Sequence, residues 1–342
     1  MKFGPVALAD ALGGMVAHAV RHDGLVLKKG DLVRAEHLPL LAAAGLREIV
    51  IAQLEDGDVG EDAAALRLAQ AVAGGEVRVE APFTGRSNLF STSAGVLAFD
   101  SAGIDRINAV DETITIATLP AYRTVVEGEM IATVKIIPFA VPGAALERAL
   151  SAAHGLTLEV APFKPLRIGV ISTLLPGLKP TTIAKTLRVL EGRLEPAQAR
   201  VVAEERVAHE APALTAAIQA VAPLCDLLIV YGASAITDRR DVIPASLEAA
   251  GGRIEHFGMP VDPGNLLLVG ALVRDGVEIP VLGAPGCARS PKENGFDWVL
   301  HRLLAGLPVT GADIRRMGVG GLLMEIVSRG QPRTGEAPIP DE

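Results

Sequence analysis

The sequence has few cysteines and few aromatic residues, and it lacks long apolar runs. Its two cysteines, Cys225 and Cys287, lie far apart and belong to no CxxC or Cys/His cluster. This pattern argues against a disulfide framework and a zinc site, and favours a reduced, cytoplasmic compartment. The longest apolar runs, such as 266–273, have the length of a strand and fall well short of the roughly 20 residues that span a bilayer. Because no basic leader precedes a continuous apolar stretch at residues 1–20, we also expect no cleaved signal and no membrane association.

An excess of positive charge is also missing. The sequence has 32 Lys and Arg residues and 40 Asp and Glu residues, which gives a formal net charge of −8. This balance argues against nucleic acid or an anionic membrane as a partner. Apolar residues make up 49% of the sequence, which also contains 36 Gly and 23 Pro. The composition excludes a disordered chain, a coiled coil and collagen, and 342 residues predict two domains that each bury a core.

The second half of the chain alternates predicted strands with predicted helices. We expect strands over 166–173, 199–207 and 226–231, helices over 181–194, 211–221 and 241–250, then a hairpin of 266–273 and 278–282 and a helix over 291–304. In the helix over 181–194, Arg188 and Arg193 lie off the apolar face. The alternation predicts an α/β fold with a doubly wound, mainly parallel sheet.

The first half alternates less regularly and predicts a smaller α+β domain. Helices are expected over 35–44, 60–73 and 142–154, and strands over 48–54, 76–80, 112–119 and 130–139. The pair Pro162 and Pro165 indicates the boundary, so the regions are 1–162 and 163–330. The polar, Pro-rich segment 331–342 is expected to be a flexible tail.

The turn after the most apolar strand, 226–231, is the best candidate for a ligand site. Gly232, Ala233 and Ser234 are small enough to let backbone N–H groups approach an anion, and the following helix N-terminus favours negative charge. A phosphate group would fit there, with Arg239, Arg240 and Arg289 as candidate partners. An ordinary turn is an equally good interpretation, in which Thr237, Asp238 or Asp241 caps the helix. A carboxylate beside an anion is repulsive unless it holds Mg²⁺ or accepts a hydrogen bond from a heterocyclic N–H.

Two further turns have a similar character. One is Asp262–Asn265, and the other is 283–292, where a Pro-Gly reversal precedes Ser290 and the start of a helix. Each turn alone is weak evidence, because Pro and Gly are common in turns.

Taken together and in this order, the three turns resemble the MoaB/Mog molybdopterin-binding domain, which is also found within MoeA and the gephyrin E domain. That family has an apolar strand, a Gly-Gly-x-[Ser/Gly] turn with a downstream Asp, a Pro-Gly-x-Pro turn, and a Leu-Pro-Gly-x-Pro turn that opens a helix. The corresponding stretches here are LLIVYGASAITD, DPGN and GAPGCARSPK, and RDVIP at 240–244 resembles the Arg-Asp-x-Thr-Pro element of the Mog branch. The resemblance covers about 165–310.

The first half resembles MoeA more loosely, through ALGGMVAH at 11–18 and LKKGDLVRAEHLPLLAAAGLREIVI at 27–51. The two halves of the chain together resemble the MoeA-like branch of the family.

The departures from the family pattern bear on catalysis. The second Gly of the family turn is Ala233, and the Ser-Thr-Gly-Asp-Glu that follows the first strand in MoeA is Ser-Thr-Leu-Leu-Pro at 172–176. Backbone donors survive such changes, whereas an absent carboxylate can neither hold Mg²⁺ nor act as a base. The sequence therefore supports a binding fold better than a catalytic role.

The resemblance implies a protein of molybdenum cofactor biosynthesis that binds molybdopterin or its nucleotide form. As an enzyme it would catalyse adenylyl transfer to molybdopterin or molybdenum insertion, with Asp238 or Asp241 as the catalytic acidic residue and Mg²⁺ on Asp238. Ungapped counting from Gly232 selects Asp238, and the RDVIP element selects Asp241. The resemblance implies these pterin-binding residues: Ser172, Thr173, Gly232, Ala233, Ser234, Arg239, Pro263, Gly264, Pro285, Gly286, Cys287 and Ser290.

A different class of function stays open beside the enzyme. The chain could be a non-catalytic molybdopterin carrier that serves a nucleotidyltransferase or a molybdenum hydroxylase. The family also implies a homo-oligomer. An unrelated nucleotide-binding oxidoreductase is disfavoured because no G-x-G-x-x-G follows the first strand of the second half.

Overall fold

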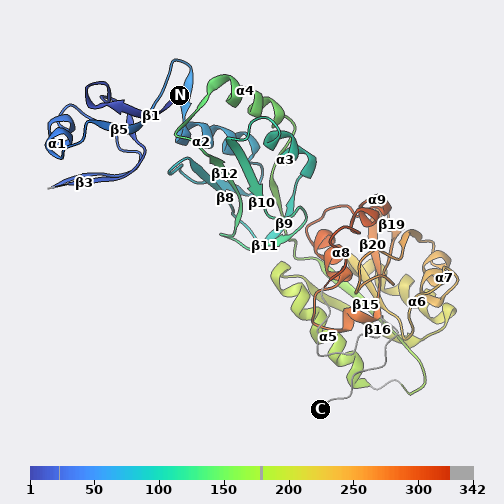
Figure 1. Cartoon of the computed structure of the whole chain (residues 1–342). Helices are drawn as coiled ribbons and strands as arrows, with labels where there is room; N and C mark the ends of the chain where they lie inside the picture. The colour runs from blue at the N-terminus through green and yellow to red at the C-terminus, as the bar shows by residue number, and fades with distance from the viewer. Residues whose placement is uncertain (23, 178–179, 324–342) are drawn as a thin grey trace, which may run out of the picture. The chain divides into compact units, whose positions relative to one another are not determined.

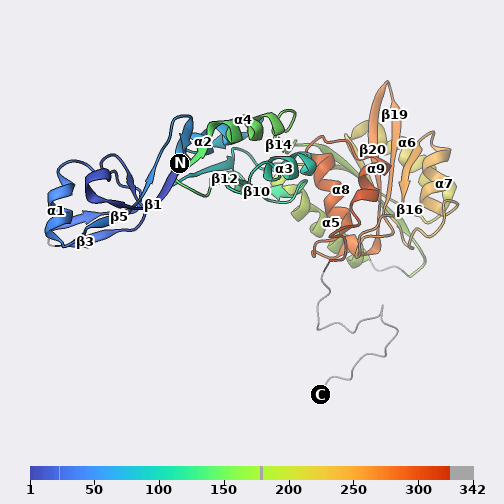
Figure 2. The same cartoon turned by 45° about the horizontal axis from the view of Figure 1, so that its top comes forward.

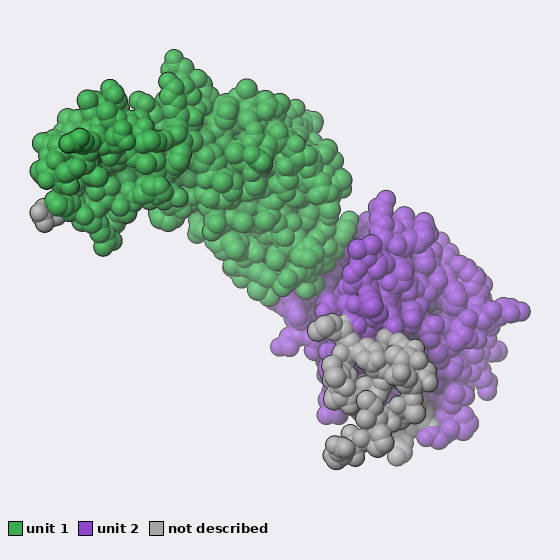
Figure 3. Space-filling view, in the orientation of Figure 1, with its two compact units in different colours: residues 1–162 green, residues 163–342 purple. Residues whose placement is uncertain are grey.

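The computed structural model describes residues 1–22, 24–177 and 180–323 (Figure 1). The chain divides into two compact units, Met1–Pro162 and Phe163–Glu342, which Figure 3 colours separately. Within the described ranges, no helix is both long and apolar enough to cross a membrane. The predicted tail at 331–342 lies outside the described residues.

The second unit is built on a six-stranded sheet with the order β16-β15-β17-β20-β19-β18. Its strands are β15 (Arg167–Leu174), β16 (Arg200–Ala208), β17 (Leu227–Tyr231), β18 (Arg253–Phe257), β19 (Leu268–Arg274) and β20 (Val277–Ala284). β15 runs parallel to β16 and β17, and β17 runs parallel to β20, whereas β19 is antiparallel to both of its neighbours. The predicted α/β class with a mainly parallel sheet is confirmed. All strands except β19 end at the same side of the sheet, which we call the carboxyl edge.

Helices cover both faces of this sheet (Figure 2). They are α5 (Pro180–Leu194), α6 (Ala211–Val221), α7 (Val242–Ala249), α8 (Gly295–Leu304) and α9 (Gly311–Arg316). Alternate residues of β17 supply two cores: Ile229 and Tyr231 pack with α5 and α8, and Leu228 and Val230 pack with α6 and α7. Burial on both faces explains why this strand is continuously apolar.

Two sequence expectations for this unit were wrong in detail. The helix expected over 291–304 begins at Gly295, because Gly286–Arg289 forms a 3-10 turn and Asn294 caps α8 with a capping box. Arg193, expected off the apolar face of its helix, is buried. β18 was not expected, because its sequence RIEHF mixes charged and apolar residues and its side chains are mostly half-buried.

The first unit contains several small sheets and four helices among its described residues. Its strands are β1 (Lys2–Ala7), β2 (Met15–Val16), β3 (Val20–His22), β4 (Leu25–Leu27), β5 (Glu48–Gln53), β6 (Asp58–Gly60), β7 (Val77–Val79), β8 (Arg86–Ser91), β9 (Gly95–Ala98), β10 (Ile114–Thr118), β11 (Thr124–Val125), β12 (Met130–Ile136), β13 (Ala140–Pro142) and β14 (Glu159–Pro162). Its helices are α1 (His37–Ala43), α2 (Glu61–Val72), α3 (Ser101–Asn108) and α4 (Gly143–Ala152). The largest sheet, β10-β12-β8-β7, packs against α2 to form the main core of this unit.

Candidate functional site

The predicted ligand residues lie at or just beyond the carboxyl edge of the second unit. Ser172 and Thr173 are near the end of β15, and the other predicted residues lie in the loops that follow β17, β18 and β20. The parallel pairing therefore brings to one edge turns that are far apart in the sequence.

The end of β15 is bonded to the loop after β17. Thr173 is buried, and its Oγ1 accepts a hydrogen bond of 2.8 Å from the backbone N–H of Ala233. Gly232 is needed in this loop, because a Cβ at that position would lie 2.7 Å from the carbonyl oxygen of Ser234. His209, directly after β16, also contacts Thr173 and Ser234. Sequence reasoning missed this histidine, since it stands alone among scattered histidines.

Arg289 joins the loop after β20 to the loop after β17. Its Nη2 donates to the carbonyl oxygen of Gly232 at 2.9 Å, and its Nη1 donates to Thr186 Oγ1 on α5 at 3.0 Å. The guanidinium lies 5.5 Å from the centroid of the Tyr231 ring. Burial lowers the pKa of Arg289 from its ordinary, strongly basic value. Arg289 therefore places a fixed, half-buried positive charge at the carboxyl edge.

The loop after β18 touches the start of α8 through backbone atoms. The N–H of Gly295 donates to the carbonyl oxygen of Pro263 at 2.8 Å. Gly264 has a φ of 140°, and a Cβ there would lie 2.7 Å from the nitrogen of Gly295. Only glycine fits at this position. The turns after β17 and β20 are thus linked directly by Arg289, and the Asp262–Asn265 turn is bonded to the start of α8, which follows the turn after β20.

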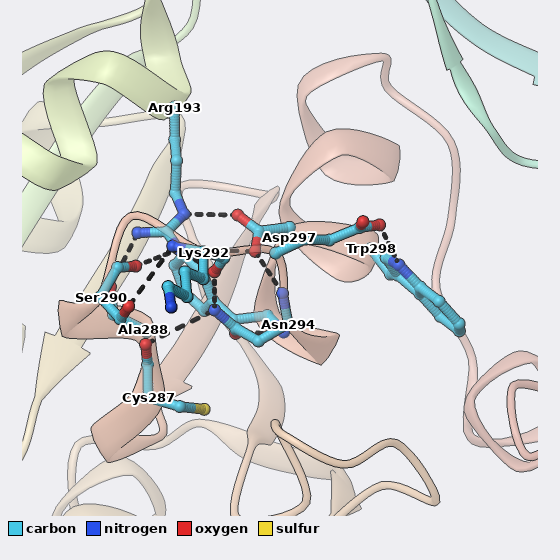
Figure 4. A network of polar contacts seen from close by, with 10 residues as sticks. Arg193, Cys287, Ala288, Ser290, Lys292, Asn294, Asp297 and Trp298 are labelled. Carbon is cyan, nitrogen blue, oxygen red and sulfur yellow. Dashed lines mark hydrogen bonds and ion pairs between the residues drawn. The ribbon is translucent and has the colours of Figure 1, made fainter. Parts of the chain in front are cut away.

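A buried ion pair fastens the loop between β20 and α8 (Figure 4). Arg193 on α5 pairs with Asp297 on α8, and each side chain is 8% exposed. The same guanidinium donates to the carbonyl oxygens of Ala288 at 2.7 Å and Ser290 at 2.8 Å. Asp297 is also the acidic member of the α8 capping box with Asn294. The conformation of this loop is therefore fixed from two helices.

The two candidate acidic residues are both engaged locally. Asp238 pairs with Arg240, with 2.7 Å between Oδ1 and Nε, and hydrogen bonds from Arg240 lower the pKa of Asp238 to about 2. Asp241 Oδ2 accepts the backbone N–H groups of Thr237 at 2.6 Å and Asp238 at 2.9 Å, which lowers the pKa of Asp241. The alternative in which the Asp241 side chain caps α7 is not observed, because that carboxylate bonds back into the preceding loop.

These carboxylates do not fit a resident Mg²⁺ site. Mg²⁺ prefers several oxygen ligands in octahedral geometry. In the part of the chain that the structure describes, no group of three or more His, Cys, Asp or Glu residues could hold a metal ion. We therefore assign no chemical step to a resident metal, and Mg²⁺ binding by Asp238 stays a prediction of the sequence resemblance alone.

Two residues with buried hydroxyl groups lie on neighbouring strands near the carboxyl edge. Ser172 on β15 and Tyr231 on β17 are register partners, and both are buried. Neither hydroxyl has a hydrogen-bond partner among the described residues. Burial raises the pKa of Tyr231 to about 12, so its hydroxyl stays protonated at neutral pH. A buried hydroxyl without a partner costs about 1–3 kcal/mol, which a bound ligand could offset.

Comparison with known proteins gives structural neighbours and no sequence relatives. No family model matches the chain, and no curated protein matches it. One similar solved structure is a molybdopterin biosynthesis MoeA protein from Pyrococcus horikoshii (15% identity, TM-score 0.30), in a match that covers 72% of this chain and 79% of that chain. A molybdenum cofactor biosynthesis protein from Pyrococcus furiosus (13%, TM-score 0.26) is matched over 90% of this chain and 64% of that chain. The molybdopterin biosynthesis enzyme MoaB from Thermus thermophilus (17%, TM-score 0.27) is matched over 42% of this chain and 98% of that chain. Because these TM-scores are below 0.5, the function argued below rests on the residues of this chain.

The two cysteines are expected to differ in reactivity toward iodoacetamide. Cys225 is 4% exposed, and burial raises its pKa to about 11, so only about one thousandth of it is thiolate at pH 8. Burial also raises the pKa of Cys287, but its side chain is partly accessible. We expect mass mapping of the native protein to find Cys287 alkylated first and Cys225 only after unfolding. Equal labelling of the two would contradict this arrangement.

Proposed function

We propose that this protein binds a phosphate-bearing pterin of the molybdopterin class at the carboxyl edge of its second unit, and acts in molybdenum cofactor biosynthesis. The observation that carries the proposal is the linkage of β15 and the turns after β17 and β20 at one edge, with the Asp262–Asn265 turn bonded to the start of α8. Ala233 contacts Thr173, Arg289 contacts Gly232, and Gly295 contacts the loop of Pro263. The sequence resemblance supplies the ligand class, and the contacts supply a site of matching chemistry.

The loop after β17 provides donors for a phosphate. No hydrogen bond among the described residues uses the backbone N–H groups of the exposed Ser234 and Ala235, so these two donors are available to an anion. Arg289, bonded to the carbonyl oxygen of Gly232, adds positive charge to the same loop. Charge-assisted bonds of this kind are the stronger ones in proteins.

A carrier role is favoured over catalysis. Leu175 and Pro176 stand where the family has acidic residues, and Asp238 and Asp241 are bonded to their own loop. The site therefore offers binding groups without a free carboxylate to act as a base. A carrier would hand the pterin to a nucleotidyltransferase or to a molybdenum hydroxylase, and an enzyme would transfer an adenylyl group or insert molybdenum.

A titration with molybdopterin, Mg²⁺ and either ATP or CTP tests both roles. Tight binding without pyrophosphate release supports the carrier. Pyrophosphate release supports the adenylyl transferase and overturns the carrier. If molybdopterin does not bind at all, the proposed function is wrong.

The alanine variants of Asp238 and Asp241 are expected to differ in stability. Asp241→Ala removes the acceptor of two backbone N–H groups and should lower the free energy of unfolding by about 1 kcal/mol. Asp238→Ala removes an exposed ion pair with Arg240 and should change stability little. Urea unfolding measures both effects. We expect neither variant to change the Mg²⁺ dependence of ligand affinity, and its loss in Asp238→Ala would establish the metal role of that residue.

A further inference from the structure

Three polar side chains from separate strands form a hydrogen-bonded chain at the carboxyl edge. Thr173 belongs to β15, His209 directly follows β16, and Ser234 lies in the loop after β17. Thr173 Oγ1 lies 2.8 Å from His209 Nδ1, and His209 Nε2 lies 2.9 Å from Ser234 Oγ. The backbone N–H of His209 donates to the carbonyl oxygen of Leu174 at 2.9 Å, which holds the backbone of His209 next to β15.

The environment of Thr173 decides which ring nitrogen of His209 carries the proton. Thr173 is 1% exposed, and its Oγ1 already accepts the N–H of Ala233. The buried hydroxyl proton needs an acceptor of its own, since leaving it unpaired is unfavourable. His209 Nδ1 is the acceptor within reach. A proton on Nδ1 would instead leave the Thr173 hydroxyl proton buried and unpaired, so the neutral ring carries its proton on Nε2.

This tautomer sets the direction of the next hydrogen bond. The Nε2–H of His209 donates to Ser234 Oγ, so the hydroxyl proton of Ser234 is not used by the histidine. Ser234 is exposed, and its O–H can therefore donate outward to a ligand. Hydrogen bonds in such a chain polarise one another and strengthen the terminal donor.

We infer that His209 is a positioning residue that makes Ser234 a directed hydrogen-bond donor to an oxygen of a bound phosphate monoester. The identity of that phosphate as part of a pterin rests on the proposed function. An anion rich in acceptors can use this O–H as a donor, whereas an ammonium or amide N–H group can bind only at the remaining lone pair of the Ser234 hydroxyl.

The tautomer can be measured without any ligand. In full-length protein labelled with ¹⁵N at histidine, NMR correlation of ring nitrogens with ring protons shows which nitrogen is protonated. The spectrum of His209→Asn identifies the His209 signal by its absence. We expect the proton on Nε2, and a neutral ring protonated on Nδ1 would overturn the inference.

Matched variants test the role of the chain in binding inorganic phosphate, followed through the amide signals of 233–236. Ser234→Ala should weaken phosphate binding about tenfold. His209→Gln reaches Ser234 with an amide N–H and should stay within about threefold of the wild type, whereas His209→Asn is too short to reach Ser234 and should lose as much as Ser234→Ala. His154→Gln, at an exposed histidine of the first unit, is the control and should have no effect. Wild-type affinity in Ser234→Ala would overturn the inference, as would a tenfold loss in His209→Gln.

Repeating the series with molybdopterin separates this inference from the proposed function. If phosphate binds through Ser234 but molybdopterin does not bind, the proposed function fails and the inference stands. If molybdopterin binds equally well to the wild type and to Ser234→Ala, the inference fails and the proposed function stands.

Discussion

Replacing Asp297 with alanine is expected to lower the free energy of unfolding of the second unit by about 3–5 kcal/mol. The carboxylate of Asp297 is the partner of a buried Arg193, and its removal leaves the guanidinium charge buried without a counter-ion. It also removes the acidic member of the capping box of α8. The single tryptophan, Trp298, lies in this helix and is a local fluorescence probe for urea unfolding.

A matched control separates the ion pair from the cap. Asp313 is the acidic member of the capping box of α9, bonded to Thr310. Asp313→Ala loses the cap together with the attraction of Arg302 and Arg316, and should cost about 1 kcal/mol. The double variant Arg193→Met with Asp297→Leu removes both buried charges and should be more stable than Asp297→Ala. If it were instead destabilised by the sum of the two single changes, the buried ion pair would not be the cause.

Replacing Arg289 with methionine is expected to weaken binding of a phosphate-bearing ligand by about 10- to 100-fold. The change removes the half-buried charge and the link between Gly232 and Thr186. Arg289→Lys keeps the charge but should recover only part of the affinity, because one ammonium group does not reproduce the planar fork that spans both partners. Isothermal titration calorimetry measures the change.

Arg239 provides the control for this second variant. It lies exposed in the loop after β17, and it was predicted to bind the phosphate. Because its side chain is freely solvated, Arg239→Met should reduce affinity by less than about threefold. Equal losses in Arg239→Met and Arg289→Met would show that net charge, rather than the placement of Arg289, governs binding.

The strands that face two cores were predictable, and the polar edge strand was not. β17 is apolar at every position because helices cover both sheet faces, so its sequence alone marks it as a central strand. β18 lies at the edge of the sheet, where charged residues such as Arg253 and Glu255 are tolerated and no apolar pattern is required. The buried Arg193 was missed because its partner Asp297 is distant in the sequence.

The residues of the candidate site also divide into those that the sequence reveals and those that it does not. Gly232 and Gly264 are visible in a sequence, because close approach of the backbone requires glycine at both positions. The Pro-Gly pair at 285–286 is visible as well, but it opens a 3-10 turn in which Gly286 has room for a side chain. His209 has no local pattern. Its place depends on the register of β15 with β16, which pairs Thr173 with Val207 and so carries the histidine to the end of β15. Such a pairing is set by packing of the whole sheet.

The clamp of Arg193 on the loop after β20 has a kinetic consequence. Since the carbonyl oxygens of Ala288 and Ser290 are already held, this segment has little freedom left to lose when a ligand arrives. Association should then proceed at the rate of diffusive encounter, without a slow rearrangement. Differences in affinity between ligands should therefore appear in their dissociation rates.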